Sequence, residues 1–169
     1  MCNKVFCDPV ITYTESFLPV WKPNPPGNDN LAFGKYVRPR MLACMDRPFA
    51  AVDGDLRTAF TIYADDKLSF GEDWLQFDLE KPFTIDRYVL ISKPPDPKWR
   101  PDTFTLQRSD DGFCWVNVDS VSHNAKDRTE RAVPEFTARF VRLYLPKGKP
   151  FSVNEFELYR TGGKKLRRN

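Results

Sequence analysis

From residue 30 onward the sequence consists of short segments in which apolar and polar residues alternate, and this alternation limits the possible folds more than any other feature. A period of two is typical of β-strands with one buried face. No stretch of ten residues has the periodicity of an amphipathic helix, and the 15 prolines disfavour long helices. The alternating segments cover residues 73–81, 84–92, 103–109, 113–121, 138–146 and 152–160.

These segments predict an all-β fold, namely an antiparallel jelly-roll β-sandwich, because half-buried strands at this spacing are typical of antiparallel sheets. Asp111-Gly112 is a strong turn signal and predicts a hairpin between the third and fourth segments. The residues expected to face the core are Leu75, Phe77, Leu79, Ile85, Val89, Ile91, Phe104, Leu106, Val141, Leu143 and Leu145. The last segment is expected to place Asn154, Phe156 and Leu158 opposite Val153, Glu155 and Glu157.

The length of 169 residues suits one domain. Residues 1–29 lack sustained periodicity and end in WKPNPPGND, which is typical of an extended arm or linker. Residues 30–160 form the predicted sandwich, and residues 161–169 form a basic tail.

The formal net charge of +3 depends on this tail, and the rest of the chain is close to neutral. A basic face for nucleic acid is therefore not expected. No apolar stretch has the length of a membrane span, and the first residues lack the apolar core of a secretory signal. Two alternatives remain, a cytoplasmic protein or an excised module of a secreted protein, which would be extracellular.

The four cysteines, Cys2, Cys7, Cys44 and Cys114, leave the redox state open. They form no CxxC motif, and a single histidine in the chain argues against a zinc site. Two disulfides or four free thiols both fit the sequence, and free thiols are the preferred interpretation.

The motifs predict no enzymatic activity. His123, the only histidine, lies in the polar segment SVSHNAKD, so any Ser-His-Asp or Cys-His arrangement would depend on one exposed loop residue. The chain contains no GxSxG, no HExxH and no phosphate-binding glycine loop.

The segment RPFAAVDGDLRTAF is a candidate cation-binding loop. Asp53 and Asp55 flank a glycine that permits a sharp turn, and Thr58 follows three residues later. Ca²⁺ takes six to eight oxygen ligands from carboxylates, carbonyls and hydroxyls. Asp53, Asp55, Thr58 and a carbonyl near Ala50 could supply several of them, although DGD also occurs in ordinary turns.

Six motifs follow one another in an order that resembles a known family. They are NLAFGKYV, AAVDGDLRTAF, DWLQFDLEKPFTIDRYVLIS, FTLQRSDDGFCWVNVDSV, ARFVRLYLP and NEFELYR. Over residues 30–160 they are similar to the discoidin or coagulation factor V/VIII C-type domain, in the galactose-binding-like superfamily that includes the family 32 carbohydrate-binding modules. The resemblance implies an eight-stranded jelly-roll sandwich that is not an enzyme and binds ligands through loops at one end.

The resemblance also implies a structural Ca²⁺ that joins the first and last strands of the sandwich. The positions that match the family's calcium ligands are the carbonyls of Ala50 and Asn154 and the side chains of Asp53, Asp55, Thr58 and Glu155.

The family's sugar site corresponds to the loop SKPPDPKWRPD, residues 92–102. Trp99 could stack on a pyranose ring while Lys93, Arg100 and Asp102 hydrogen-bond its hydroxyls. Trp99 could instead cap the core of the sandwich. The loop has no asparagine, and His123 lies in a later loop than the family's histidine.

Three functions therefore fit the resemblance. The leading hypothesis is a non-catalytic carbohydrate-binding module that is part of a larger secreted glycan-active protein and binds a glycan. The first alternative is a discoidin-type subunit that docks to a protein partner in a larger assembly. The second is binding to anionic phospholipid at a membrane surface, through the candidate loop tips Met41-Leu42, Tyr63 and Phe70 and the neighbouring Arg38, Arg40 and Arg47.

Overall fold

A computed structural model describes residues 24–40, 48–62, 73–145 and 149–161. Within these ranges the chain forms antiparallel strands and two short 3₁₀ helices, η2 (Pro48–Ala51) and η3 (Pro97–Trp99). None of these helices is long and apolar enough to cross a membrane. The strands are β1 (Tyr36–Pro39), β2 (Phe60–Ile62), β3 (Asp73–Ile91), β4 (Phe104–Ser109), β5 (Val116–Val121), β6 (Arg128–Leu145), β7 (Phe151–Val153) and β8 (Glu155–Tyr159).

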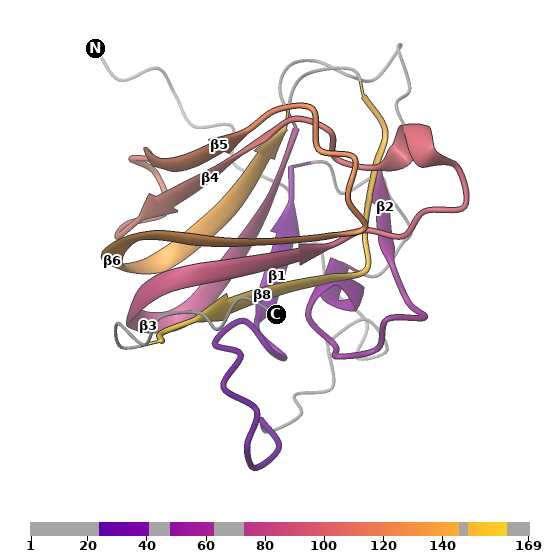
Figure 1. The fold of residues 1–169 in the computed structure, drawn as a ribbon. Helices are drawn as coiled ribbons and strands as arrows, with labels where there is room; N and C mark the ends of the chain where they lie inside the picture. Colours follow the sequence, from indigo (N-terminus) through magenta and orange to yellow (C-terminus); the bar gives the residue numbers. More distant parts are fainter. Residues whose placement is uncertain (1–23, 41–47, 63–72, 146–148, 162–169) are drawn as a thin grey trace, which may run out of the picture.

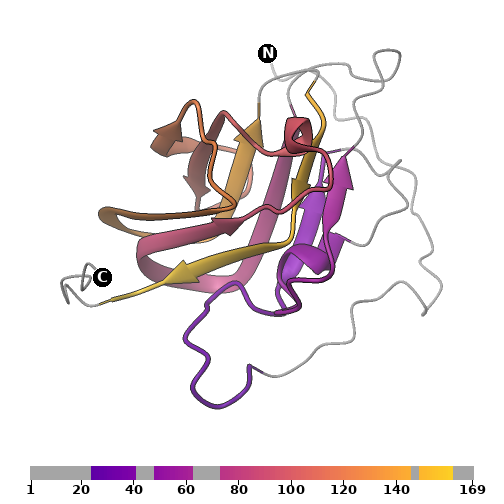
Figure 2. The same ribbon diagram turned by 45° about the vertical axis from the view of Figure 1, so that its right-hand side comes forward.

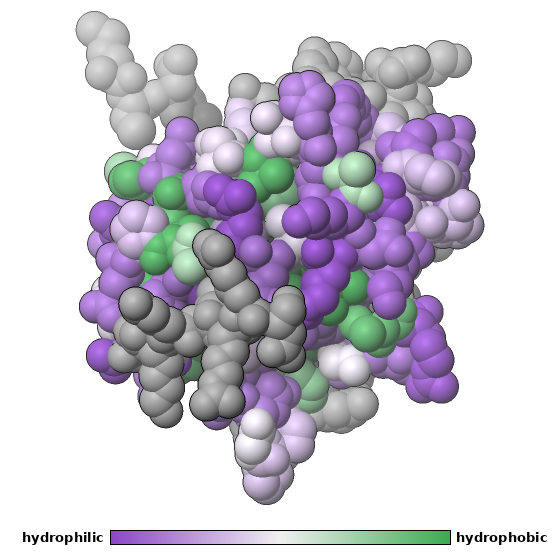
Figure 3. Space-filling model, viewed as in Figure 1, coloured by the Kyte–Doolittle hydropathy of each residue, from purple (hydrophilic) through white to green (hydrophobic). Residues whose placement is uncertain are grey.

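The described strands form two sheets, and each pair of neighbouring strands within a sheet is antiparallel. The larger sheet has the order β1-β3-β6-β4-β5, with β8 also paired to β3, and the smaller sheet consists of β2 and β7 (Figure 1). The fold is thus the all-β antiparallel sandwich that the alternating segments predict. On the side seen in Figure 3 the surface is mainly hydrophilic, with small separate hydrophobic groups.

The larger sheet is strongly curved, because its two long central strands, β3 and β6, bend along their length (Figure 2). These strands have 19 and 18 residues. β1 pairs with the first part of β3 and β8 with its last part. The sequence predicted two strands, 73–81 and 84–92, where the structure has one. The register shifts between Asp78 and Phe83 and between Ile85 and Arg87 allow this single strand to bend.

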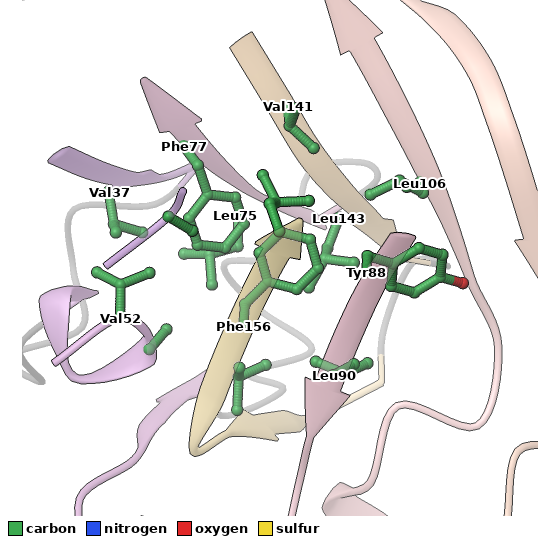
Figure 4. Packing of buried hydrophobic residues seen from close by; sticks show 14 of the residues in the cluster. Val37, Val52, Leu75, Phe77, Tyr88, Leu90, Leu106, Val141, Leu143 and Phe156 are labelled. Atoms are coloured by element: carbon green, nitrogen blue, oxygen red, sulfur yellow. The ribbon is translucent and has the colours of Figure 1, made fainter. Parts of the chain in front are cut away.

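The core contains residues of both sheets and is rich in aromatic rings (Figure 4). Phe156 of β8 stacks on Phe77 from the first part of β3, with ring centroids 4.5 Å apart. Phe156 also lies 6.3 Å from the ring of Tyr88, in the last part of β3. One ring thus contacts both halves of the same strand across the interior.

The predicted core positions are buried, but the face of β3 changes along the strand. Val89 and Ile91 are buried as predicted, yet they lie outside the main core cluster, whereas Tyr88 and Leu90 lie within it. The change of face coincides with the irregular pairing between Ile85 and Arg87, where the register of β3 with β6 shifts.

The hairpin between β4 and β5 forms at the predicted turn. Gly112 has a φ of 77°, which favours glycine. The Asp111 carboxylate accepts hydrogen bonds from the amides of Phe113 and Cys114, both at 2.8 Å. These bonds hold the pKa of Asp111 at about 2. Because the amides bond to Asp111, β5 begins at Val116 rather than at Phe113. Cys114 is free and exposed, and the other three cysteines lie outside the described residues.

The predicted last strand, 152–160, is two strands in different sheets. β7 pairs with β2, and β8 pairs with β3. Asn154 lies between them, and its amide donates to the carbonyl oxygen of Ile91 at 2.9 Å. This change of sheet brings the start of β8 next to the loop that precedes β2.

The beginning and end of the described sandwich lie side by side. The amide of Leu31 donates to the carbonyl oxygen of Leu158 at 2.8 Å. In return, the amide of Leu158 donates to Oδ1 of Asn30 at 3.0 Å, across 128 residues of sequence. These two bonds attach the segment around Asn30 to β8.

Candidate functional site

The loop before β2 folds around the side chain of Asp53. Oδ1 of Asp53 accepts from the amide of Asp55 at 2.9 Å. Oγ1 of Thr58 lies 2.9 Å from Oδ2 of Asp53 and 2.8 Å from the carbonyl oxygen of Asp55. Gly54 has a φ of 75°, and a Cβ there would lie 2.8 Å from the ring of Phe33. The turn therefore requires glycine between the two aspartates.

Glu155, at the start of β8, faces this loop from 101 residues later in the sequence. Its Oε2 accepts from the amide of Gly54 at 3.0 Å. Its Oε1 is buried and has no hydrogen-bond partner. Burial raises the pKa of Glu155 to about 8, and the charges of Asp53 and Glu157 add to this effect, while the bond from Gly54 opposes it. A buried carboxylate oxygen thus lies beside a second carboxylate.

The other predicted calcium ligands are arranged less directly. The Asp55 carboxylate accepts from Nε and Nη2 of Arg57, at 2.8 and 2.7 Å, on the exposed side of the loop. Ala50 is buried in η2. Across the described ranges, no three His, Cys, Asp or Glu side chains form a group that could hold a metal ion. The side chains that the structure brings together are therefore those of Asp53, Thr58 and Glu155.

Asn154 connects this loop to the loop that follows β3. Its Nδ2 donates to the carbonyl oxygens of Thr58 at 2.9 Å and Leu56 at 3.2 Å. Its Oδ1 accepts from the amide of Lys93 at 2.6 Å. The sequence prediction used only the carbonyl of Asn154, so this role of the side chain was missed. The sequence signal that could have suggested it is a polar asparagine on the same face of the predicted strand as Phe156 and Leu158.

The loop after β3 contains η3, which carries Trp99. Asp96 caps this helix, since its Oδ1 accepts from the amide of Lys98 at 3.0 Å. Trp99 is half-buried, and η3 lies next to β7. The indole is thus held by a capped helix and keeps part of its surface in solvent.

The three charged residues predicted for this loop differ in their surroundings. Lys93 is exposed. Arg100 is mostly buried and pairs with Asp127 in the loop between β5 and β6. Asp102 accepts from Nζ of Lys149 at 2.9 Å. Asp127 and Lys149 were not predicted, because residues from separate loops become neighbours only through folding.

A further loop residue, Asn124, fastens the two neighbouring loops together. Its amide donates to the carbonyl oxygen of Asp102 at 2.8 Å. Its Oδ1 accepts from Oγ1 of Thr129 at 2.9 Å. The adjacent His123 is exposed and has a φ of 56°. The loop 92–102, which has no asparagine of its own, is thus held to the loop between β5 and β6 by Asn124.

The residues predicted to contact a membrane are only partly described. Met41, Leu42, Arg47, Tyr63 and Phe70 lie outside the described residues. The two remaining arginines are on or next to β1. The guanidinium of Arg38 lies 5.8 Å from the centre of a ring of Trp74. Nη1 of Arg40 lies 4.0 Å from Oδ1 of the buried Asp73.

A comparison with protein families identifies the domain. The family model of the NedA-like, galactose-binding domain, of F5/F8 type C, matches residues 50–143, which is more than half of the chain. The chain belongs to this family. The match confirms the resemblance to coagulation factor C-type domains that the sequence motifs indicate. The matched region contains Asp53 and Trp99 and ends within β6.

Solved structures similar to this galactose-binding domain include several carbohydrate-binding modules. A fucose-binding module of Streptococcus pneumoniae has a TM-score of 0.68 and 22% identity, with 80% of this chain and 97% of that one covered. A family 32 module of Clostridium perfringens, in complex with GalNAc-β-1,3-galactose, has a TM-score of 0.67 and 13% identity, with 78% and 99% covered. A chitosan-binding module of a Paenibacillus sp. IK-5 chitosanase/glucanase, in complex with chitotriose, has a TM-score of 0.66 and 22% identity, with 78% and 100% covered.

At these identities the similarity establishes the fold of the galactose-binding domain. The comparison with curated proteins gave no match. The ligand must therefore be argued from the chain's own loops.

Proposed function

We propose that this galactose-binding domain is a non-catalytic carbohydrate-binding module that binds a glycan through the loops following β3 and β5. The observation that carries the proposal is the position of Trp99, half-buried on a capped helix and adjacent to charged loop residues. Similar solved structures contain GalNAc-β-1,3-galactose, chitotriose or the Lewis B antigen, which supports a glycan as the ligand class.

The chemistry of the loop suits a sugar. The exposed part of an indole can pack against the apolar face of a pyranose ring. The exposed ammonium of Lys93 and the carboxylate of Asp102 supply a donor and an acceptor for ring hydroxyls. Arg100, which is mostly buried against Asp127, acts in this proposal as a support for the loop rather than as a direct ligand.

We also propose a structural Ca²⁺ next to this end of the domain. The buried Oε1 of Glu155, without a hydrogen-bond partner, and the nearby carboxylate of Asp53 support a cation, which would compensate both charges. Thr58 and the carbonyls of Ala50 and Asn154 would complete the ligand set. Asp55 would contribute its carboxylate by giving up an exposed ion pair with Arg57. The ion would supply stability to the loop.

A glycan array probed with the intact protein, in Ca²⁺ and in EDTA, tests the proposed function. We expect binding to a defined group of glycans, and a loss of that binding in the Trp99→Ala variant. Absence of binding to every glycan under both conditions would contradict the proposal. Co-sedimentation with phosphatidylserine vesicles, or recovery of a stable protein partner, would then support one of the alternative functions.

A further inference from the structure

The loop between β5 and β6, residues 122–127, is attached to the proposed sugar loop, residues 92–102, on both sides of η3. The amide of Ser92 donates to the carbonyl oxygen of Asp127 at 2.8 Å. The carboxylate of Asp127 pairs with the guanidinium of Arg100, directly after η3. One residue of the first loop thus contacts the sugar loop before and after its short helix.

Asn124 provides a second attachment, at the end of the sugar loop. Its amide donates to the carbonyl oxygen of Asp102 at 2.8 Å. Its Nδ2 donates to the carbonyl oxygen of Pro101 at 3.4 Å. Pro101 follows soon after Trp99 in the sequence, so these bonds hold the backbone next to the segment that carries the indole.

The side chain of Asn124 is itself fixed by β6. Its Oδ1 accepts from Oγ1 of Thr129 at 2.9 Å and from the amide of Lys126 at 3.2 Å. Thr129 is buried in β6, where it pairs with Leu90 of β3. Asn124 is half-buried, whereas the other residues of the loop 122–127 are exposed. The contacts of the sugar loop therefore lead through Asn124 to the interior of the sandwich.

The backbone of His123 is strained at the point where this attachment is made. His123 is exposed and has a φ of 56°, a conformation that residues with a Cβ disfavour. Residues keep such a conformation where the surrounding contacts enforce it. His123 directly precedes the amide that donates to Asp102, and the bonds of Asn124 supply the enforcing contacts. A strained residue thus accompanies the placement of Asn124 against the sugar loop.

We propose that Asn124 is a positioning residue for the glycan site, and that it holds the loop 92–102 in the conformation that presents Trp99 to the ligand. This inference rests on the proposed function of that loop. A loop that is ordered before binding loses less conformational freedom when a glycan binds, and the affinity is higher for this reason. Asn124 acts through the loop backbone, at Pro101 and Asp102, and needs no contact with the glycan itself.

Isothermal titration of the intact protein with a glycan identified on the array measures the effect on binding. Asn124→Ala removes the side-chain bonds, and glycan binding should weaken roughly threefold to tenfold, because the loop must then be ordered on binding. Asn124→Asp keeps the Oδ1 acceptor for Thr129 and Lys126 and should restore most of the affinity. Asn117→Ala, which removes the same side chain from β5 outside both loops, should bind like the unmodified protein.

Fluorine NMR of protein that contains 5-fluorotryptophan reports on Trp99 without any glycan. The resonance of Trp99, identified by its absence in Trp99→Phe, should shift or broaden in Asn124→Ala and return in Asn124→Asp. Trp115 serves as the internal reference. The centre of its ring lies 4.1 Å from the guanidinium carbon of Arg142, on the outer face of the larger sheet, and its resonance should not change in either variant.

Three results would overturn the inference. They are unchanged affinity in Asn124→Ala, a loss of affinity with an unchanged Trp99 resonance, and equal changes at Trp99 and Trp115, which would mean that the substitution acts on the whole domain. If the unmodified protein binds no glycan, the proposed function fails on the array, and the fluorine spectrum decides separately whether Asn124 holds the loop. A changed Trp99 resonance then supports that role, and an unchanged one excludes it. Thermal unfolding verifies that each variant is folded.

Discussion

The side-chain amide of Asn154 donates to the carbonyl oxygen of Thr58 at 2.9 Å, across 96 residues of sequence. The same side chain accepts from the amide of Lys93. One buried residue at the break between β7 and β8 thus holds the proposed calcium loop and the proposed sugar loop in a fixed relation.

Replacing this residue should destabilise the domain. Asn154→Ala removes three hydrogen bonds at part-buried positions, to the Lys93 amide and two carbonyl oxygens, and each such bond contributes about 1 kcal/mol. In a domain of this size 1 kcal/mol lowers the melting temperature by about 2–4 °C. We therefore expect a decrease of roughly 5 °C or more in a thermal scan. Asn117→Ala, at an exposed position, is the control, and equal melting of both variants would contradict the role of Asn154.

The calcium proposal predicts opposite effects of one substitution in two buffers. Ca²⁺ at a hundredfold excess over its Kd should add about 2.7 kcal/mol to the free energy of unfolding of the unmodified protein, and its melting temperature should rise accordingly. Glu155→Gln should abolish this increase. In EDTA at pH 9 the same variant should melt higher than the unmodified protein, because it removes a buried charge beside Asp53. A melting curve that is the same in Ca²⁺ and EDTA, with no bound ion by elemental analysis, would refute the calcium site.

The proposed sugar site depends on Trp99. Trp99→Ala should abolish measurable glycan binding, because a stacked ring contributes about 1–3 kcal/mol and a millimolar sugar complex has only about 4 kcal/mol in total. Trp115→Ala removes the same side chain from the sheet face and should leave binding at the loops unchanged. Isothermal titration with a glycan identified on the array provides the measurement. If Trp99→Ala instead lowers the melting temperature by several degrees, Trp99 is part of the core and the sugar binds elsewhere.

The turn at Asp111 predicts a defined dependence on pH. The pKa of this carboxylate is lowered to about 2 in the folded protein, from 3.8, by bonds from the amides of Phe113 and Cys114 and from the hydroxyl of Ser109. Its stabilising effect is therefore fully present above about pH 4 and is lost as the pH falls towards 2. Asp111→Asn keeps an acceptor without the charge. The difference in unfolding free energy between the two proteins should shrink over this range, and a constant difference would contradict the assignment.

The alternation of apolar and polar residues correctly predicted the core positions of regular strands. It did not predict features that depend on contacts between distant segments. Leu75 and Phe77 were correctly assigned to the core, because the first part of β3 is regular. The inward positions of Tyr88 and Leu90 were missed, since the shift after Ile85 depends on pairing with β6. The division at Asn154 was missed for a similar reason, because it arises from contacts with two loops.

For the candidate site, the family resemblance identified Asp53 and Glu155, which the fold brings to the same loop. No local pattern could predict that Arg100 would pair with Asp127, since these residues are 27 positions apart and belong to different loops. Nor does strand alternation alone reveal that Trp115 and Arg142 meet. That contact depends on the register of β4, β5 and β6.

The paired contacts between Asn30, Leu31 and Leu158 have a consequence for how this fold can be used. A domain whose two ends meet can be inserted into a surface turn of a host protein without forcing the host's backbone apart. The same proximity permits circular permutation, in which a short connection joins the region of Leu158 to that of Asn30 and new termini are opened at an exposed turn. Every strand of the sandwich would then remain available, in a different order along the chain.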